Sequence, residues 1–129
     1  MCIRDSFNTE PHCHTLFEQL KAFREKESVI RSKTYSYFYN PSWCFNHTLP
    51  PCSTFINEEI YGTYFYKDKK EKHWFNFDQV IFSKELLYNQ SGWKYQEHSL
   101  EILGLFDLTS SKAIFDHLPI TFNLQRNEL

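Results

Sequence analysis

The segment NFDQVIFSKELL, residues 76–87, has the pattern of a strand that begins beside an acidic residue. In it, an apolar run from Val80 to Phe82 follows the acidic residue Asp78. Branched and aromatic side chains favour extended backbone because they pack well on a pleated sheet. The pattern predicts a strand from about Phe77 to Phe82, with Asp78 at its entrance.

Four other segments have the pattern of strands. KTYSYFYNP and YGTYFYKDKK alternate and end in turn-forming or charged residues. LEILGLFDL is short and apolar, and LPITFNL places Leu118, Ile120, Phe122 and Leu124 on one face. The four segments are residues 33–41, 61–70 (with the strand entered at Gly62), 100–108 and 118–124.

Two stretches predict irregular connections. Residues 41–60 have no clear period and contain Pro50-Pro51, which predicts a long loop without regular structure. The charge run 68–72 predicts a solvated turn.

One segment, HTLFEQLKAFREKESVIRSK (residues 14–33), has the pattern of a helix. Thr15 and Glu18 have the spacing of a capping box, in which each side chain satisfies a backbone amide of the first turn. Apolar residues recur at helical spacing after Thr15, and we predict a helix from about Leu16 to Glu27. The apolar stripe consists of Leu16, Phe17, Leu20 and Phe23.

One main helix and about five strands define an α+β fold. A single helix cannot cover both faces of such a sheet, and an uncovered aromatic face is costly in water. The chain is rich in rings, with 13 Phe, 8 Tyr and 3 Trp, so the cost would be large. These features are a first indication that the chain is only part of a domain.

The composition narrows the class of protein. A formal net charge of −2 gives no support for a generally basic nucleic-acid-binding surface or for attraction to an acidic membrane. No run approaches the roughly 18 apolar residues of a membrane span, and MCIRDSFNTEP at the start has no apolar signal-peptide core. We therefore expect a cytoplasmic protein without membrane contact, whose four cysteines are reduced thiols. In a secreted chain these cysteines would allow three disulfide pairings.

An Asp-His pair precedes the last predicted strand in IFDHLPITFNL, residues 114–124. Histidine flanked by carboxylates is suited to proton transfer near neutral pH and to binding a negatively charged oxygen. Pro119 fixes its own φ and favours extended backbone at Leu118, so the pair has a rigid support. Because neighbouring side chains of an extended chain point in opposite directions, we expect Asp116 and His117 to face different partners.

His117 then needs another carboxylate to orient its ring, and Asp78 is the best candidate. Asp78 also stands at the entrance of an aromatic-flanked strand, and strand pairing would bring it within hydrogen-bond reach. Such a bond fixes the tautomer of the imidazole and raises the basicity of its other nitrogen. Asp116 would remain available to a hard divalent cation, which prefers carboxylate oxygen.

At these residues the sequence resembles the C-terminal part of the endonuclease/exonuclease/phosphatase superfamily, the DNase I-like enzymes. The family has an Asp in a strand of the form D-[YHQ]-[ILV]-x-x-S, and Asp78–Ser83 has this form. The family's Ser-Asp-His-x-Pro appears here as residues 115–119, with Phe115 in place of the serine. The resemblance implies a four-layer α/β sandwich, of which this chain would supply one sheet and one helix.

A third family motif, Gly-Asp-Phe-Asn followed closely by Pro, resembles DSFNTEP, residues 5–11. Asn8 matches the asparagine that contacts phosphate in the family, whereas Ser6 stands where the family has Asp. The stretches YFYNPSW, GTYFYK and NFDQ resemble a bacterial subgroup. The resemblance runs from about Phe7 to Leu124 and covers roughly the second half of the family domain.

The match breaks inside that third motif. We therefore expect residues 1–6 to be a non-native start and residues 7–129 to be the C-terminal half of a family domain, without the metal-binding Asn and Glu motifs of the first half. Genomic sequence that continues upstream through a true Gly-Asp-Phe-Asn would confirm this expectation. A native stop codon just before Met1 would refute it.

In the family, one or two Mg²⁺ or Mn²⁺ ions neutralise a phosphate group while water attacks phosphorus in line. By resemblance, His117 would be the general base or bind a phosphate oxygen, and Asp78 would orient it. Asp116 would assist the metal or the attacking water, and Asn8 would hold a phosphate oxygen. The implied parent hydrolyses phosphoester bonds in a nucleic acid or a small phosphodiester. This chain lacks the family's metal-binding Glu and the Asp replaced by Ser6, so we expect it to be inactive by itself.

Other side chains leave alternatives open. Cys44-x2-His47 has a zinc-like spacing, although incidental thiols in a variable loop are the other interpretation. The tryptophans would either stack on a base or sugar or cover the sheet edge. The lysine-rich run 67–72 would steer a phosphate substrate or form a soluble turn. The histidines and cysteines concerned are His12, Cys13, His14, Cys44, His47 and Cys52, and the tryptophans are Trp43, Trp74 and Trp93.

A different functional class also fits the composition. A small, non-catalytic α+β interaction module would use the aromatic surface to bind a partner. Such a module would unfold cooperatively, whereas a fragment would expose a large apolar sheet face and aggregate.

Overall fold

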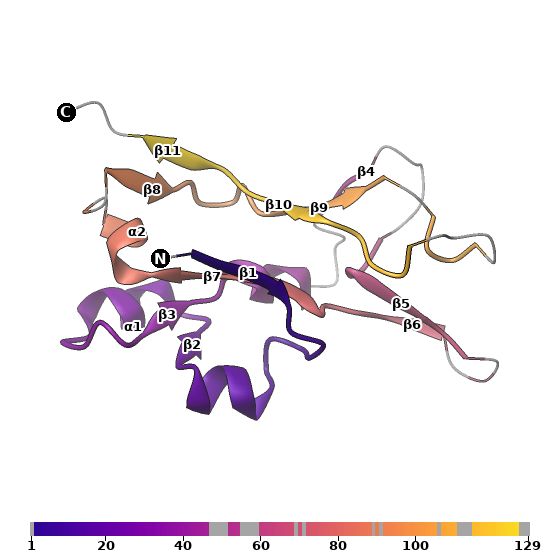
Figure 1. Cartoon of the computed structure of the whole chain (residues 1–129), viewed down its shortest axis with the longest axis horizontal. Coiled ribbons are helices and arrows are strands. Elements are labelled where there is room, and N and C mark those ends of the chain that lie inside the picture. Colours follow the sequence, from indigo (N-terminus) through magenta and orange to yellow (C-terminus); the bar gives the residue numbers. More distant parts are fainter. Residues whose placement is uncertain are drawn as a thin grey trace.

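The computed structural model describes residues 2–46, 52–54, 60–68, 70, 72–88, 90, 92–105, 107–110 and 115–126. Over these residues the chain has the mixed α+β composition that the sequence predicts. Figure 1 shows the strands in two layers, with a two-stranded hairpin extending to one side.

The lower layer in Figure 1 is a four-stranded sheet. In spatial order its strands are β1 (Cys2–Ser6), β7 (Asp78–Ser83), β3 (Phe38–Tyr39) and β2 (Ala22–Phe23). β7 is antiparallel to both of its neighbours, and β2 runs parallel to β3. β7 confirms the strand predicted at about 77–82, and its apolar residues Val80–Phe82 are fully buried.

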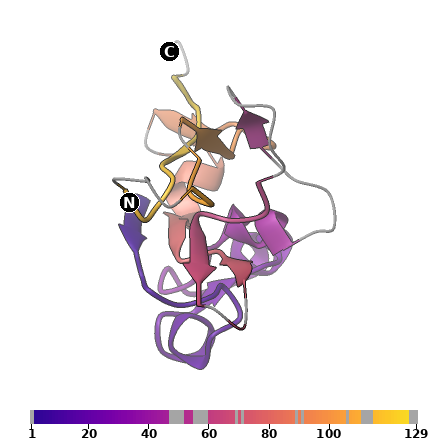
Figure 2. The same ribbon diagram turned by 90° about the vertical axis from the view of Figure 1, so that its right-hand side faces the viewer.

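β1 lies at one edge of this sheet, as the turned view in Figure 2 shows. The pairing runs from Cys2 opposite Phe82 to Ser6 opposite Asp78. Backbone amides and carbonyls form such a ladder with little regard to side-chain identity. The sheet therefore includes residues 2–6, which precede Phe7, where the resemblance to the phosphohydrolase family begins.

The second layer is built from strands of two to four residues. One group has the order β10 (Ile120–Thr121), β9 (Glu101–Gly104) and β4 (Cys52–Thr54), and a separate ribbon pairs β11 (Leu124–Arg126) with β8 (Trp93–Tyr95). β9 confirms the strand predicted within residues 100–108. The strand predicted at 118–124 is divided between β10 and β11, and Leu124 is 38% exposed instead of sharing the buried face of Ile120. This difference arises because the chain passes from one sheet to another between β10 and β11.

A hairpin of β5 (Tyr64–Lys67) and β6 (Lys72–Phe75) forms a further antiparallel pair. β5 is the strand predicted to be entered at Gly62. Of the charge run predicted as a turn, Asp68 and Lys70 lie between β5 and β6, Lys72 belongs to β6, and residues 69 and 71 lie outside the described residues. Gly62 has no room for a side chain, because a Cβ would lie 2.5 Å from the carbonyl oxygen of Phe75.

Apolar side chains fill the space between the two layers. Phe82 of β7 stacks on Tyr95 of β8 with 4.3 Å between ring centroids and meets Phe122 edge-on at 5.2 Å. The expectation of a single sheet is therefore wrong, since two layers of strands bury their apolar faces against each other. The buried core consists of Val29, Phe45, Ile60, Val80, Phe82, Leu86, Leu87, Tyr95, Leu100, Ile102, Leu108, Leu118 and Ile120.

The helix predicted from Leu16 to Glu27 is also wrong. Its place is taken by η1, a π-helical turn (Thr15–Gln19), by β2, and by α1 (Lys26–Arg31). Lys21 has a φ of 54°, a left-handed conformation that ends the helical turn. Its carbonyl then accepts a hydrogen bond from the amide of Phe38, so the backbone joins the sheet. Pairing with a distant segment outweighs the local helical pattern.

The predicted capping box does not form. His14, not Thr15, precedes the helical turn, and no side chain caps it. Glu18 instead pairs with the imidazole of His14, with 2.9 Å between Oε2 and Nε2. Of the predicted apolar stripe, Leu16 is buried whereas Phe17 is exposed.

The stretch predicted as an irregular loop contains regular structure. A 3-10 helix, η2 (Pro41–Asn46), begins it, and β4 lies within it. The amide of Ser42 donates to Oδ1 of Asn40, which fixes the first turn, and Phe45 is buried in the core. Pro50-Pro51 lies outside the described residues, and the strand predicted before the loop is limited to β3.

A short helix that the sequence analysis missed, α2 (Lys84–Tyr88), follows β7 directly. Lys84 donates from Nζ to the carbonyl of Ser32 at 2.6 Å, and the hydroxyl of Tyr88 donates to the carbonyl of Ile30 at 3.0 Å. These bonds hold α1 and α2 together at the same end of the molecule (Figure 1).

Candidate active site

Asp78 occupies the first position of β7, where the strand leaves the hairpin. Its amide donates to Oγ1 of Thr63 at 3.1 Å, so the strand entrance is tied to the residue before β5. Its side chain is 17% exposed, which leaves the carboxylate mostly surrounded by protein. A carboxylate in such a place needs hydrogen-bond donors.

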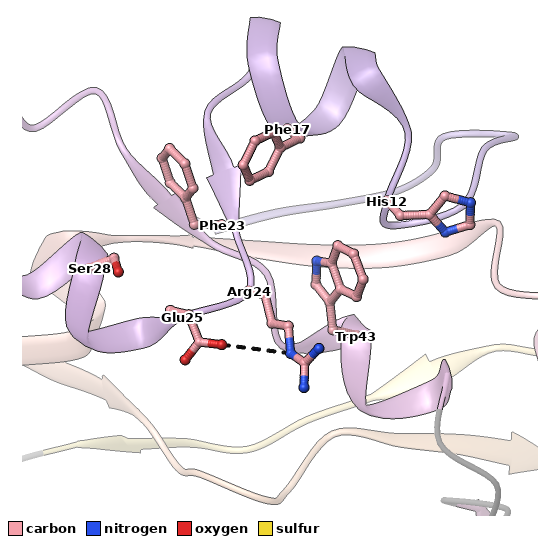
Figure 3. Close-up of a pocket in the computed structure, with 7 residues that line it drawn as sticks. All are labelled: His12, Phe17, Phe23, Arg24, Glu25, Ser28 and Trp43. Atoms are coloured by element: carbon pink, nitrogen blue, oxygen red, sulfur yellow. Dashed lines mark ion pairs between the residues drawn. The ribbon is translucent and has the colours of Figure 1, made fainter.

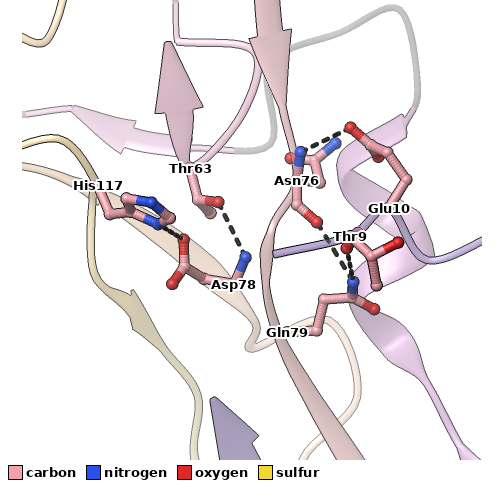
Figure 4. A network of polar contacts seen from close by, with 7 residues as sticks. All are labelled: Thr9, Glu10, Thr63, Asn76, Asp78, Gln79 and His117. Carbon is pink, nitrogen blue, oxygen red and sulfur yellow. Dashed lines mark hydrogen bonds and ion pairs between the residues drawn. The ribbon is translucent and has the colours of Figure 1, made fainter. Parts of the chain in front are cut away.

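His117 supplies such a donor. Its Nδ1 lies 2.7 Å from Oδ2 of Asp78, and Figure 4 shows the ring facing that carboxylate. A carboxylate can only accept hydrogen bonds, so the proton of this bond belongs to Nδ1. In the neutral imidazole Nε2 is then unprotonated, and the ring is 25% exposed. Nε2 can therefore take a proton or, once protonated, bind an anionic oxygen.

Aromatic rings flank the imidazole. The ring of Tyr64 lies 5.0 Å from that of His117 and stacks on Phe77 at 5.2 Å. The backbones of Tyr64 and His117 also form an isolated antiparallel bridge. Together with the bond to Asp78, these contacts fix the plane and the position of the His117 ring.

Asn8 lies on the loop that leaves β1, at the same end of the sheet as Asp78. Ser6 pairs with Asp78, and the amide of Phe7 donates to the carbonyl of Phe77 at 2.9 Å. Asn8 itself is exposed and has a φ of 49°. The structure thus brings the backbone of Asn8 to the region of the Asp78–His117 pair.

A buried network of hydrogen bonds holds the loop that contains Asn8 and Thr9 against the sheet. The side chain of Gln79 donates from Nε2 to the carbonyl of Thr9 at 2.6 Å and accepts at Oε1 from Nδ2 of Asn40 at 2.8 Å. Glu10 accepts a bond from the amide of Asn76 at 2.9 Å (Figure 4). Sequence reasoning missed Gln79 and Thr63, although a glutamine at the head of an apolar strand was a signal for a buried polar contact.

Asp116 is exposed and makes no described hydrogen bond or ion pair. Within the described parts of the chain, no three His, Cys, Asp or Glu side chains come together as a metal site. Mg²⁺ prefers octahedral oxygen coordination, of which Asp116 would provide a small part. The described residues therefore form no three-residue metal site, and a Mg²⁺ ion held by Asp116 would take its other oxygens from water and substrate phosphate.

A cavity of about 510 Å³ lies elsewhere on the molecule, beside η1 and η2. Arg24 is placed over the ring of Trp43 at 5.8 Å from its centroid and pairs with Glu25 at 3.7 Å. None of the four predicted site residues lines this cavity. Its walls are His12, Phe17, Phe23, Arg24, Glu25, Ser28 and Trp43 (Figure 3).

The histidines and cysteines considered as zinc ligands do not form a cluster among the described residues. His14 pairs with Glu18, His12 lies 6.3 Å from the ring of Trp43, and Cys13 and Cys44 are free thiols. His47 and the side chain of Cys52 lie outside the described residues.

The two described thiols should differ in reactivity. Hydrogen bonds from the side chain of Thr9 and the backbone of Thr15 lower the pKa of Cys13, whereas burial raises the pKa of Cys44 to about 11. Because the thiolate is the nucleophile, a raised pKa leaves little reactive Cys44 at pH 8. We expect iodoacetamide to modify Cys13 at least about tenfold faster than Cys44, measured by peptide mass spectrometry. In urea the rates should converge, and equal rates in the native chain would contradict the described environments.

The tryptophans have separate surroundings. Trp43 lines the cavity, Trp74 packs on Phe65 at 5.0 Å between centroids, and Trp93 lies under the guanidinium of Arg126 at 5.9 Å. In the lysine-rich run, Nζ of Lys67 donates to the carbonyl of Ser110.

Among the described residues, no helix is long and apolar enough to span a bilayer. Comparisons with family models, with curated proteins and with solved structures gave no match.

Proposed function

We propose that this chain is part of a divalent-metal-dependent phosphohydrolase of the endonuclease/exonuclease/phosphatase type, with Asp78 and His117 at its reaction centre. We place the parent enzyme in the cytoplasm, and we propose that the two strand layers belong to the family's four-layer sandwich. The observation that supports the proposal is the 2.7 Å contact between Nδ1 of His117 and the Asp78 carboxylate. It stands at the sheet end where the Asn8 loop leaves β1.

The pair suits chemistry at a phosphate group. Asp78 holds His117 in the tautomer whose Nε2 is free, and it stabilises the imidazolium once that nitrogen gains a proton. The imidazole can then withdraw a proton from an attacking water or donate a hydrogen bond to a phosphate oxygen. Asn8 would donate from its side-chain amide to a second phosphate oxygen.

The parent would use Mg²⁺ or Mn²⁺ to neutralise phosphate charge, and Asp116 would contribute one oxygen ligand. We expect this chain alone to bind the phosphate group without hydrolysing it, because it lacks the family's metal-binding Glu and the Asp replaced by Ser6. The substrate class is a phosphoester of a nucleic acid or a small phosphodiester.

Phosphate binding tests the proposal. In a titration of the ¹⁵N-labelled chain with inorganic phosphate, we expect the NMR signals of His117 and Asn8 to shift. Replacing His117 with Ala removes a charge-assisted hydrogen bond of about 1.5–3 kcal/mol, so the Kd should rise roughly tenfold or more.

His14→Ala is the matched control, because His14 is also paired with a carboxylate, that of Glu18 at 2.9 Å. It should leave the Kd unchanged. Equal losses in both variants, or signals that shift only around the cavity at Trp43, would reject the proposed site.

The alternative function, a protein-interaction module, has one specific observation in its favour. Rings on one face of the hairpin and the linker after it form an aromatic row, in which Phe75 stacks on Phe77 at 4.9 Å. Inorganic phosphate separates the two functions, because a phosphohydrolase fragment should show a shift of the His117 signal on titration and an interaction module should not. The row consists of Tyr64, Tyr66, His73, Phe75 and Phe77.

A further inference from the structure

We propose that Thr63 is the residue that positions both members of the Asp78–His117 pair. The inference rests on the proposed function, because positioning matters only if the pair acts on a substrate. Thr63 is fully buried and precedes β5. It contacts neither the imidazole nor the carboxylate in any described hydrogen bond, so it acts through the backbone on which these groups stand.

Three hydrogen bonds connect Thr63 to three separate segments. Its hydroxyl oxygen accepts from the amide of Asp78 at 3.1 Å, as Figure 4 shows. Its carbonyl accepts from the amide of Leu118 at 2.7 Å, and its own amide donates to the carbonyl of Phe75 at 2.9 Å. Thr63 therefore holds the backbone amide of Asp78 and the backbone amide of Leu118, the residue that follows His117.

The bond from Asp78 depends on the side chain of Thr63, whereas the other two use its backbone. Threonine suits the position because branching at Cβ restricts χ1 and holds the hydroxyl in place. Valine has nearly the same shape but no acceptor, and it would leave the Asp78 amide without its partner. Serine keeps the acceptor and loses one methyl group.

Loss of this bond should loosen the contact between Asp78 and His117. Hydrogen bonds weaken steeply when distance or angle departs from the favoured values, and the 2.7 Å contact between Oδ2 and Nδ1 is already short. A shift of the Asp78 backbone moves its carboxylate, while His117 stays tied to Tyr64 by the backbone bridge. The imidazole then loses its fixed tautomer.

NMR of the imidazole tests the inference. Nitrogen shifts distinguish the two tautomers, and a hydrogen-bonded Nδ1 proton exchanges slowly enough to be seen. We expect the wild type and Thr63→Ser to show the Nδ1-protonated form of His117, and Thr63→Val to lose the Nδ1 proton signal and mix the tautomers. Thr63→Val should also raise the Kd for inorganic phosphate at least threefold.

Thr34→Val is the matched control, because Oγ1 of Thr34 also accepts a backbone amide at 3.1 Å, that of Ser36. It should keep the wild-type imidazole spectrum. A folded Thr63→Val variant with that same spectrum overturns the inference. If Thr63→Val does not fold, hydrogen exchange of the Asp78 amide in the wild type decides: slow exchange supports the bond, and exchange at the rate of an open chain overturns it.

The variant Asp78→Asn distinguishes a failure of the proposed Asp78–His117 pair from a failure of the proposed role of Thr63. If this variant leaves the His117 spectrum unchanged, the pair itself fails, and the proposed function fails with it. If Asp78→Asn changes the spectrum and Thr63→Val does not, only the role of Thr63 is rejected.

Discussion

Phe82→Ala should unfold this chain or leave it marginally stable. Phe82 is 0% exposed on the central strand β7 and touches rings from the opposite layer, namely Tyr95 and Phe122. Replacement of a fully buried phenylalanine by alanine removes apolar contacts and leaves a cavity, at a cost of about 3–5 kcal/mol. A domain of this size has a total stability of about 5–15 kcal/mol, so the loss is a large share. Urea unfolding followed by near-UV circular dichroism measures it.

Phe115→Ala is the control, because the chemical change is the same and Phe115 is 58% exposed. Its free energy of unfolding should differ from the wild type by less than about 0.5 kcal/mol. If both variants unfold at the same urea concentration, the two layers do not pack through Phe82 as described.

Gln79→Leu should have the second-largest effect on stability. Leucine fills a similar volume but makes none of the three side-chain hydrogen bonds of Gln79, to the carbonyls of Thr9 and Asn76 and from Asn40. Each buried group left unsatisfied costs about 1–3 kcal/mol, and the two shorter bonds, to Thr9 and from Asn40, should dominate, so the free energy of unfolding should fall by at least about 2 kcal/mol. The backbone amides around Asn8 should also exchange faster with solvent, because the loop loses its anchor at Thr9.

The exposed Gln96 offers the matched substitution, since no described hydrogen bond uses its side chain. Gln96→Leu should change the free energy of unfolding by less than about 0.5 kcal/mol. A Gln79→Leu variant as stable as Gln96→Leu would show that the network does not support the fold.

The contact between Asp78 and His117 could be predicted from the sequence because the immediate neighbours of each residue indicate its place in a strand. Asp78 stands directly before an apolar run, and Pro119 restricts the backbone just after His117. Both residues were therefore predicted to lie at strand entrances, and Asp78 was chosen as the carboxylate that orients His117. The side chains meet across 39 positions of sequence.

The supporting residues were hidden because their partners are distant in sequence and their bonds use the backbone. Gln79 reaches the carbonyl of Thr9, 70 positions away, and Thr63 accepts from the amide of Asp78, 15 positions away. Every residue has a backbone carbonyl, and every residue except proline has a backbone amide, so the residue type of such a partner does not reveal the bond. The helix prediction failed for a related reason, since Ala22 and Phe23 pair with β3 in spite of a helical pattern. The two layers were missed because several strands are only two or three residues long, which is too short for a periodic signal.

The most direct test of the phosphohydrolase account is a crystal structure of this chain grown with inorganic phosphate and Mn²⁺. We expect a phosphate oxygen about 2.7–2.9 Å from Nε2 of His117, within reach of the Asn8 side chain, with Nδ1 still bonded to Asp78. A phosphate bound instead in the cavity beside Arg24, or an imidazole turned away from the Asp78 carboxylate, would contradict it.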